Sequence, residues 1–164
     1  MSIKKLTWLA LFIAMSVVGG MIKVPAVVAS VALDSFPALL AAGLLGAGPS
    51  ALVAAFGHLT SAVIGGLPLG PFHILIALEM AAVVWIFAKM YQSGKKVSAV
   101  ITFVFLNSIV SPAPFIFIMG WGFYVGVLPS LLIASIINVG LAIVALPRLQ
   151  SIMNKIIYRG EAKA

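Results

Sequence analysis

Long apolar segments fill almost the whole sequence, and short stretches rich in glycine, proline and lysine separate them. A helix needs about 20 mostly apolar residues to cross the hydrocarbon layer of a bilayer, or somewhat fewer where the layer adapts to it. We therefore predict an all-α membrane protein, a bundle of six transmembrane helices. Their predicted ranges are 4–22, 35–45, 50–64, 71–91, 97–110 and 122–146.

The chain beyond Pro147 has a different pattern. Residues 148–159 place apolar side chains on one side of a helix and Arg148, Lys155 and Arg159 around the other. This pattern is typical of an amphipathic helix at a membrane surface.

Composition supports the membrane assignment. Hydrophobic residues make up 63% of the chain and charged residues 8%, with a mean hydropathy of +1.26. We expect one integral membrane domain, residues 1–164. The apolar run after Lys5 is longer than the core of a secretory signal, so we expect it to stay as the first helix. With no cysteine, the chain cannot form disulfides or thiolate metal sites.

Charge predicts the orientation. The net charge is +7, but the basic residues are clustered and form no stripe suited to nucleic acid. With six spans, both termini and two loops share one side, which holds nine Lys or Arg residues, whereas the other side holds only Lys23. The positive-inside rule places both termini in the cytoplasm. The loops at 23–34, 66–71 and 112–121 are then external.

Glu79 is the main site candidate. It follows the Gly/Pro-rich stretch 65–71 by about two helical turns, which places it roughly 10 Å deeper than Pro71 in the layer. A carboxylate at that depth costs about 2.5–3.5 kcal/mol even on the lowest scale, so it normally faces a cavity or a partner. Phe72 lies on nearly the same helix face, and His73 about 100° around from it. Glu79 is either a ligand contact or a structural acid bonded to a neighbouring helix.

Four further polar residues have the same two readings. Asp34 can cap the second helix, contact a ligand, or do both. His58 lies within the small-residue face of the third helix and can serve either an interhelical hydrogen bond or the ligand. Asn107 and Asn138 are amides in apolar helices that must find partners, on a neighbouring helix or on a ligand.

The stretch from 115 to 124 is aromatic and contains Trp121 and Tyr124. Such rings form either an interfacial belt or the wall of a pocket. Tyr124 and Asn138 are fourteen residues apart and share a helix face, to within about 40°. The polar and aromatic candidates thus converge on the external half of the bundle, as in a binding pocket filled from outside.

Enzymatic and metal sites are not predicted. The sequence has no phosphate-binding loop motif, no arrangement of serine, histidine and aspartate suited to catalysis, and too few acids for a two-metal site. We expect no enzyme activity, no metal and no cofactor. Glu79 with His58 or His73 could form the proton relay of an ion-coupled carrier, although no duplicated half is visible. A subunit that binds no ligand is the third reading.

The first helix carries Ala10 and Ala14 four residues apart, a spacing that lets another helix approach closely. With six helices and external loops rich in Gly, Pro and aromatics, the chain resembles the substrate-binding S component of energy-coupling-factor (ECF) vitamin transporters in a prokaryotic plasma membrane. The resemblance implies docking through Ala10 and Ala14 on a transmembrane T subunit driven by two cytoplasmic ATPases. It also implies that a vitamin bound from outside is released inside when the S component topples.

Two segments resemble one branch of this family, the importers of α-ribazole, a nucleoside-like cobalamin precursor. They are Leu33–Ala42 and the stretch from Gly57-His58-Leu59 through Gly65–His73 to Glu79-Met80. In such a site aromatic rings could stack on a benzimidazole, and Glu79, Asn107 or Asn138 could bond ribose hydroxyls. A pyrimidine or pyridine vitamin would suit the same groups.

Overall fold

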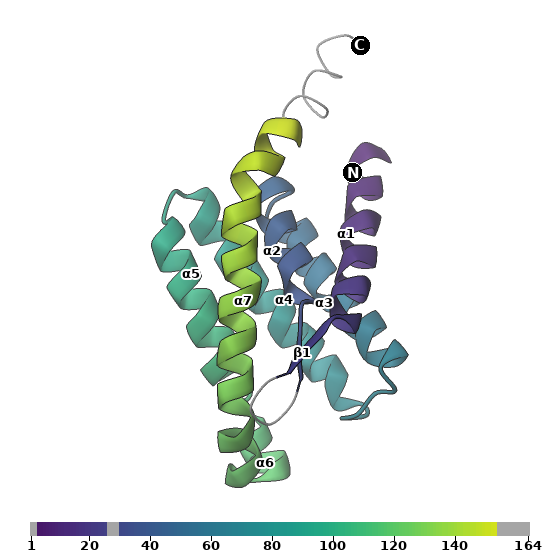
Figure 1. Ribbon diagram of the computed structural model, residues 1–164, viewed down its shortest axis with the longest axis vertical. Coiled ribbons are helices and arrows are strands. Elements are labelled where there is room, and N and C mark those ends of the chain that lie inside the picture. The colour runs from purple at the N-terminus through teal and green to yellow at the C-terminus, as the bar shows by residue number, and fades with distance from the viewer. Residues whose placement is uncertain (1–2, 26–29, 154–164) are drawn as a thin grey trace.

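The structure is a computed structural model that describes residues 3–25 and 30–153. Within this part of the chain, helices pack side by side into a bundle, with one short hairpin at its edge (Figure 1). The elements in chain order are α1 (Ile3–Met21), β1 (Lys23–Pro25), β2 (Ser30–Ala32), α2 (Ser35–Leu44), α3 (Ala47–Ile64), α4 (Phe72–Gln92), α5 (Lys96–Phe105), η1 (Leu106–Val110), α6 (Phe115–Met119) and α7 (Trp121–Met153).

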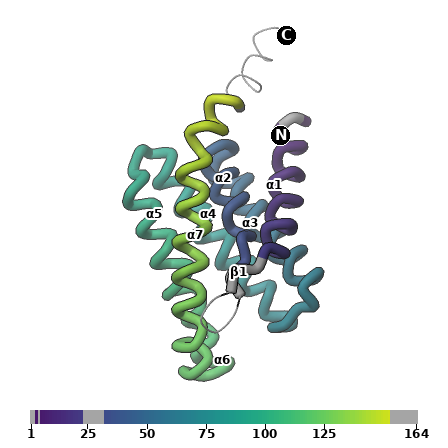
Figure 2. The backbone as a smooth tube through the Cα atoms, viewed as in Figure 1, coloured from purple at the N-terminus to yellow at the C-terminus, as the bar shows by residue number. Residues whose placement is uncertain are grey.

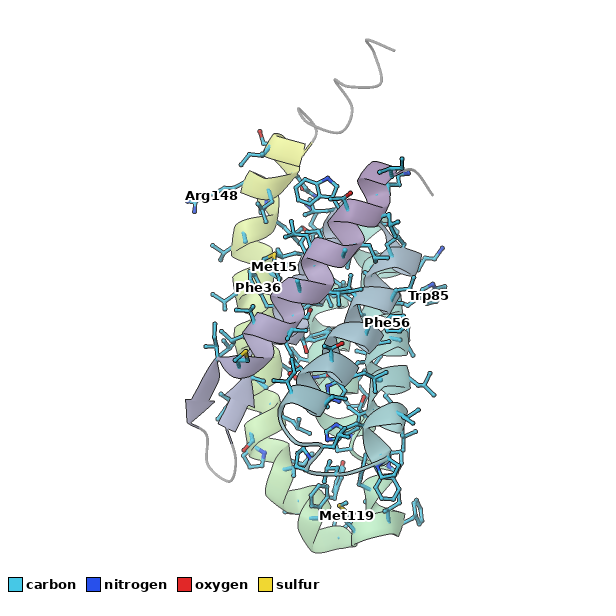
Figure 3. The ribbon with its side chains drawn as sticks, turned by 90° about the vertical axis from the view of Figure 1, so that its right-hand side faces the viewer. Met15, Phe36, Phe56, Trp85, Met119 and Arg148 are labelled. Atoms are coloured by element: carbon cyan, nitrogen blue, oxygen red, sulfur yellow. The ribbon has the colours of Figure 1, made fainter. Side chains whose placement is uncertain are left out.

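The all-helical membrane fold is confirmed in its main lines. In the part of the chain that the structure describes, four segments are long and apolar enough to cross a membrane, namely 47–64, 72–92, 96–119 and 121–152, whereas α1 and α2 are shorter apolar helices. Large apolar side chains such as Phe56 and Trp85 project from the bundle surface (Figure 3). Apolar surface facing outward is what lipid requires of a membrane protein.

Helix α2 occupies the centre of the bundle. It contacts α1, α3, α4 and α7, and its residues from Ala38 to Ala42 are at most 1% exposed. The helix is short because Gly46 follows it with φ of 98°, a conformation that favours glycine and starts α3 in a new direction. A ten-residue helix of small and branched apolar residues can therefore be enclosed on all sides.

Small residues allow α1 and α3 to approach closely. A Cβ atom added to Gly57 would lie 2.4 Å from the Cβ of Ser16, and one added to Gly20 would lie 1.9 Å from the Oγ of Ser61. Close approach through small residues is the usual basis of helix packing in lipid. Ser61 of the small-residue face predicted for the third helix thus packs against α1, whereas His58 of the same face contacts His73 of α4.

Three local predictions are wrong. Asp34 takes the position before α2 but its side chain makes no capping hydrogen bond; Asn138 of α7 accepts from the Phe36 N–H instead. The predicted loop at 23–34 contains a hairpin, in which Lys23 pairs with Ala32. Helix α7 continues through Pro147 to Met153, so the predicted surface helix does not begin there. Residues 154–159 of that predicted helix lie outside the described residues.

The two ends of the bundle differ. The N-terminal end of α1, the turn between α4 and α5 and the C-terminal end of α7 lie together at one end, whereas α6 lies at the other end and the hairpin lies in the half nearer α6 (Figure 2). Arg148 and Met119 mark these opposite ends (Figure 3). The first and last helix ends that the structure describes thus lie at the same end of the bundle, as predicted for six spans.

Candidate functional site

A cavity of about 290 Å³ lies in the half of the bundle that carries the hairpin, α6 and the loop between α3 and α4. Its walls come from β2, the start of α2, α3, that loop, α4, η1, α6 and α7. Small-molecule sites typically measure about 300–1,000 Å³, so the volume suits a small ligand. Five predicted site residues line it: Asp34, His58, Glu79, Asn107 and Asn138.

Glu79 brings a carboxylate to this cavity from the middle of α4. Its Oε2 atom is buried and has no hydrogen-bond partner among the described residues. A buried carboxylate oxygen without a partner is costly, which makes it a strong acceptor for any donor that enters the cavity. Oε2 therefore makes no hydrogen bond to a neighbouring described helix, which argues against a purely structural role for Glu79 at this oxygen.

Asn107 reaches the cavity from η1, one turn of π-helix that follows α5. The turn is closed by the bond from the Ser111 N–H to the Leu106 carbonyl, 2.8 Å long. Such turns are frequent at functional sites because they change the direction of side chains within a helix. The Asn107 amide donates to Ser135 Oγ at 2.9 Å, and its Oδ1 has no partner among the described residues. Asn107 thus adds a second free acceptor.

Asn138 also lines the cavity, but its amide is engaged by the protein. Oδ1 accepts from the Phe36 N–H at 2.7 Å, and Nδ2 donates to the carbonyls of Ala32 and Ala134, both at 2.9 Å. The side chain is 1% exposed. Asn138 therefore joins the hairpin and α2 to α7, and both of its donor hydrogens are used.

The two histidines form a continuous chain of contacts with Asp34. His58 Nδ1 lies 3.4 Å from Asp34 Oδ2, and His58 Nε2 lies 3.1 Å from His73 Nδ1. The Leu69 N–H donates to His73 Nε2 at 3.4 Å. All four ring nitrogens are occupied, and His73 itself does not line the cavity. These contacts join the start of α2 to α3, α4 and the loop before α4.

The aromatic wall differs from the predicted one. Phe115 and Phe123 line the cavity, with ring centroids 6.0 Å apart. Phe72 packs edge-on against Phe115 from outside the lining, and Trp121 is 65% exposed. Tyr124 is buried and donates to the Ile109 carbonyl at 3.1 Å. Thus Phe72, Trp121 and Tyr124 are near the cavity wall but not in it.

Several lining residues were missing from the predicted site. They include Ser35, Ser111 and Ser130 together with the two phenylalanines. The sequence signal for Phe123 was present in the aromatic stretch, but helical spacing cannot tell which ring of such a stretch turns inward. The serines carry no signal, because serine is common where membrane helices pack closely.

Ala10 and Ala14 are not part of the cavity lining and lie on an exposed face of α1. Among the residues that the structure describes, no group of three or more His, Cys, Asp or Glu side chains is placed to hold a metal ion. The polar groups at the cavity are carboxyl, amide, imidazole and hydroxyl groups, beside the rings of Phe115 and Phe123.

Comparison with known proteins identifies the family. The profile described as "ECF transporter, substrate-specific component" matches residues 4–157, nearly the whole chain. Searches of curated proteins and of solved structures give no match. The chain therefore belongs to the ECF transporter substrate-specific components, which makes it the substrate-binding subunit of a membrane importer rather than an enzyme.

Proposed function

We propose that this chain binds a small vitamin-like molecule in the Glu79 cavity from the outside of a prokaryotic cell membrane, and that α-ribazole is the ligand. The observation that carries the site is the buried Glu79 Oε2, which has no partner among the described residues and belongs to a cavity wall. A ligand hydroxyl would supply the missing donor. The volume of about 290 Å³ favours a nucleoside-sized molecule over a macrocycle.

The charge of the cavity supports an uncharged or cationic ligand. Asp34 and Glu79 line it, and no Lys or Arg does among the described side chains. A carboxylate or phosphate on the ligand would meet two acids without a counter-charge, which disfavours binding. Ribose hydroxyls match Glu79 and the free Oδ1 of Asn107, and a planar base fits against Phe123 and Phe115. A neutral pyrimidine or pyridine vitamin meets the same requirements, so the ligand is decided by experiment.

Orientation and mechanism are also proposals. The cavity lies at the end opposite the N-terminal end of α1. Nine basic residues of the sequence lie on the side of the two termini. By the positive-inside rule this terminal side faces the cytoplasm, and the cavity opens to the outside. We expect Ala10 and Ala14, exposed on α1, to meet the T subunit, with two ATPases driving the toppling that releases the ligand.

Thermal unfolding of the purified chain in detergent tests the ligand. A ligand at 100 times its dissociation constant stabilises the folded state by about 2.7 kcal/mol. At a concentration 100 times the dissociation constant of α-ribazole we expect that shift with α-ribazole, and a smaller shift with the same concentration of a pyrimidine or pyridine vitamin. Stabilisation by another vitamin and none by α-ribazole would overturn the choice of ligand but leave the site standing.

One single variant and one matched pair of variants test the site itself. Glu79→Gln keeps the shape of the side chain but removes its charge, and should weaken binding about tenfold or more, because a hydrogen bond to a charged group contributes about 1.5–3 kcal/mol. Phe123→Ala should weaken binding, whereas Trp121→Ala, which alters a ring outside the lining, should not. Equal losses for Phe123→Ala and Trp121→Ala would contradict the proposed stacking wall.

Reconstitution separates this mechanism from an ion-coupled carrier. Liposomes that contain the chain together with the T subunit and the two ATPases should take up ligand only when ATP is present on the side of the membrane that carries the ATPases. Uptake by the chain alone, driven by a proton gradient and lost in Glu79→Gln, would refute the importer mechanism for this chain.

A further inference from the structure

The contacts among Asp34, His58, His73 and the Leu69 N–H have a fixed direction. A backbone N–H can only donate, so the Nε2 atom of His73 that receives it carries no hydrogen. A neutral His73 then carries its hydrogen on Nδ1 and donates to His58 Nε2. His58 in turn carries its hydrogen on Nδ1 and donates to the Asp34 carboxylate. With both rings neutral, every donor in this histidine chain has an acceptor.

One added proton disturbs the histidine chain at the Leu69 end. If the proton binds His58 Nε2, His73 must accept at Nδ1 and therefore carry its hydrogen on Nε2, towards the Leu69 N–H. If the proton binds His73 Nε2 instead, the new Nε2–H group faces the Leu69 N–H directly. Either way the bond between Leu69 and His73 is replaced by two N–H groups that face each other.

Leu69 belongs to a loop whose backbone hydrogen bonds are local: the N–H groups of Gly66 and Leu67 donate to carbonyls at the end of α3, and the Gly70 N–H donates to Leu67. Residues 65–71 join α3 to α4, and Leu69 is part of the cavity wall. Leu67 has φ of 50°, a left-handed conformation that is strained for a residue with a side chain. Gly66 and Gly70 have φ of 84° and 55°. The loop thus carries strain that the surrounding bonds must balance, and the Leu69 bond is one of them.

We propose that His58 and His73 together form a site for one proton, and that this proton controls the loop 65–71 over the cavity. With neutral histidines the loop is held against the cavity; with one proton on the pair, Leu69 is released. The Asp34 carboxylate provides the counter-charge for a proton on His58. This inference does not depend on the identity of the ligand, because the geometry involves only protein groups.

The charged groups around the pair are few. Among the described side chains, Asp34 faces His58 from the start of α2, and Glu79 lines the same cavity from α4. Lys89, in the last turn of α4, is 16 residues from His73, compared with 6 for Glu79, and Lys95 and Lys96 lie beyond the end of α4. Glu79 is therefore the one other acid to control in an experiment.

The tautomers can be measured on the unaltered protein. The chain has two histidines, so protein labelled with ¹⁵N-histidine gives four ring nitrogen signals by NMR. At pH 8 we expect both rings to carry hydrogen on Nδ1 only. A hydrogen on Nε2 of either ring at pH 8 would overturn the proposal, and this measurement needs no variant that has to fold.

Loop release is measured with a spin label on Pro68→Cys, which is the only cysteine because the natural chain has none. Label mobility should rise between pH 8 and pH 5 with the slope of a single proton. In the double variant His58→Gln/His73→Gln the label should be mobile throughout, whereas in Glu79→Gln the transition should persist. Each of three outcomes would refute the proposal. The mobility of the label does not respond to pH when both histidines are intact, the transition persists in the double variant, or the transition disappears in Glu79→Gln.

Discussion

Replacing Asn138 with alanine should damage the fold more than ligand binding. The change leaves two groups without partners, the Phe36 N–H and the Ala32 carbonyl, which Asn138 contacts at 2.7 and 2.9 Å. The Ala134 carbonyl keeps the ordinary helical bond from the backbone N–H four residues later. Only two of the three lost contacts therefore leave an unsatisfied group.

The expected magnitude follows from these two groups. A buried polar group without a partner costs about 1–3 kcal/mol, so two give about 2–6 kcal/mol. Asn138 lines the cavity, from which water could reach the exposed groups, so we expect a loss near the lower part of this range, about 3 kcal/mol. For a chain of about this size, each kcal/mol lowers the melting temperature by about 2–4 °C. The expected fall in Tm is about 6–12 °C.

The assay is thermal unfolding in detergent, with ligand affinity measured well below the transition. Asn107→Ala is the matched control, because it removes one amide whose single hydrogen bond goes to Ser135. Its stability should fall by only about 1 kcal/mol, while its affinity for ligand falls. A Tm of Asn138→Ala within 2 °C of the wild type, combined with a loss of affinity, would show that Asn138 serves the ligand and refute this reasoning.

Two further predictions concern α1. Gly57→Ala should destabilise the protein by about 1–3 kcal/mol, because the new Cβ would lie 2.4 Å from the Cβ of Ser16 on α1. The control variant Gly48→Ala places its Cβ in open space and should not destabilise the protein. Chemical denaturation measures the stability of both variants. Ala10→Trp or Ala14→Trp should abolish copurification with a T subunit and leave ligand affinity unchanged, because a large side chain blocks a close helix contact but points away from the cavity. Normal assembly of both variants would exclude this face of α1 as the docking surface.

Much of the fold could be read from hydropathy, because lipid imposes a strict rule: every spanning segment must be apolar and must satisfy its own backbone. The errors have local causes. Pro147 does not end α7, because a proline in a membrane helix removes one hydrogen bond without forcing the helix to stop, and neighbouring helices can hold its course. Asp34 is not the cap, because a residue 102 positions beyond Phe36 in the chain supplies the acceptor.

The candidate site was predicted in part. Glu79 and Asn107 stood out because a carboxylate and an amide in apolar helices need an explanation, and the structure places both at one cavity. The aromatic wall could not be assigned, since Phe123 and Trp121 differ by two positions in the same stretch and only packing decides which ring turns inward.

The sequence by itself determined the environment and the inventory: apolar helices in a bilayer, a basic and a nearly uncharged side, and a few polar groups gathered towards one end. Only the tertiary structure decided which of these groups are already bonded to the protein. Asn138 is engaged by Phe36, 102 positions away, and the two histidines are engaged by each other across the α3–α4 loop and by Asp34, whereas Glu79 Oε2 has no partner among the described residues. The physical reason is that a hydrogen bond depends on positions in space, and residues separated by a hundred positions meet only when the helices pack.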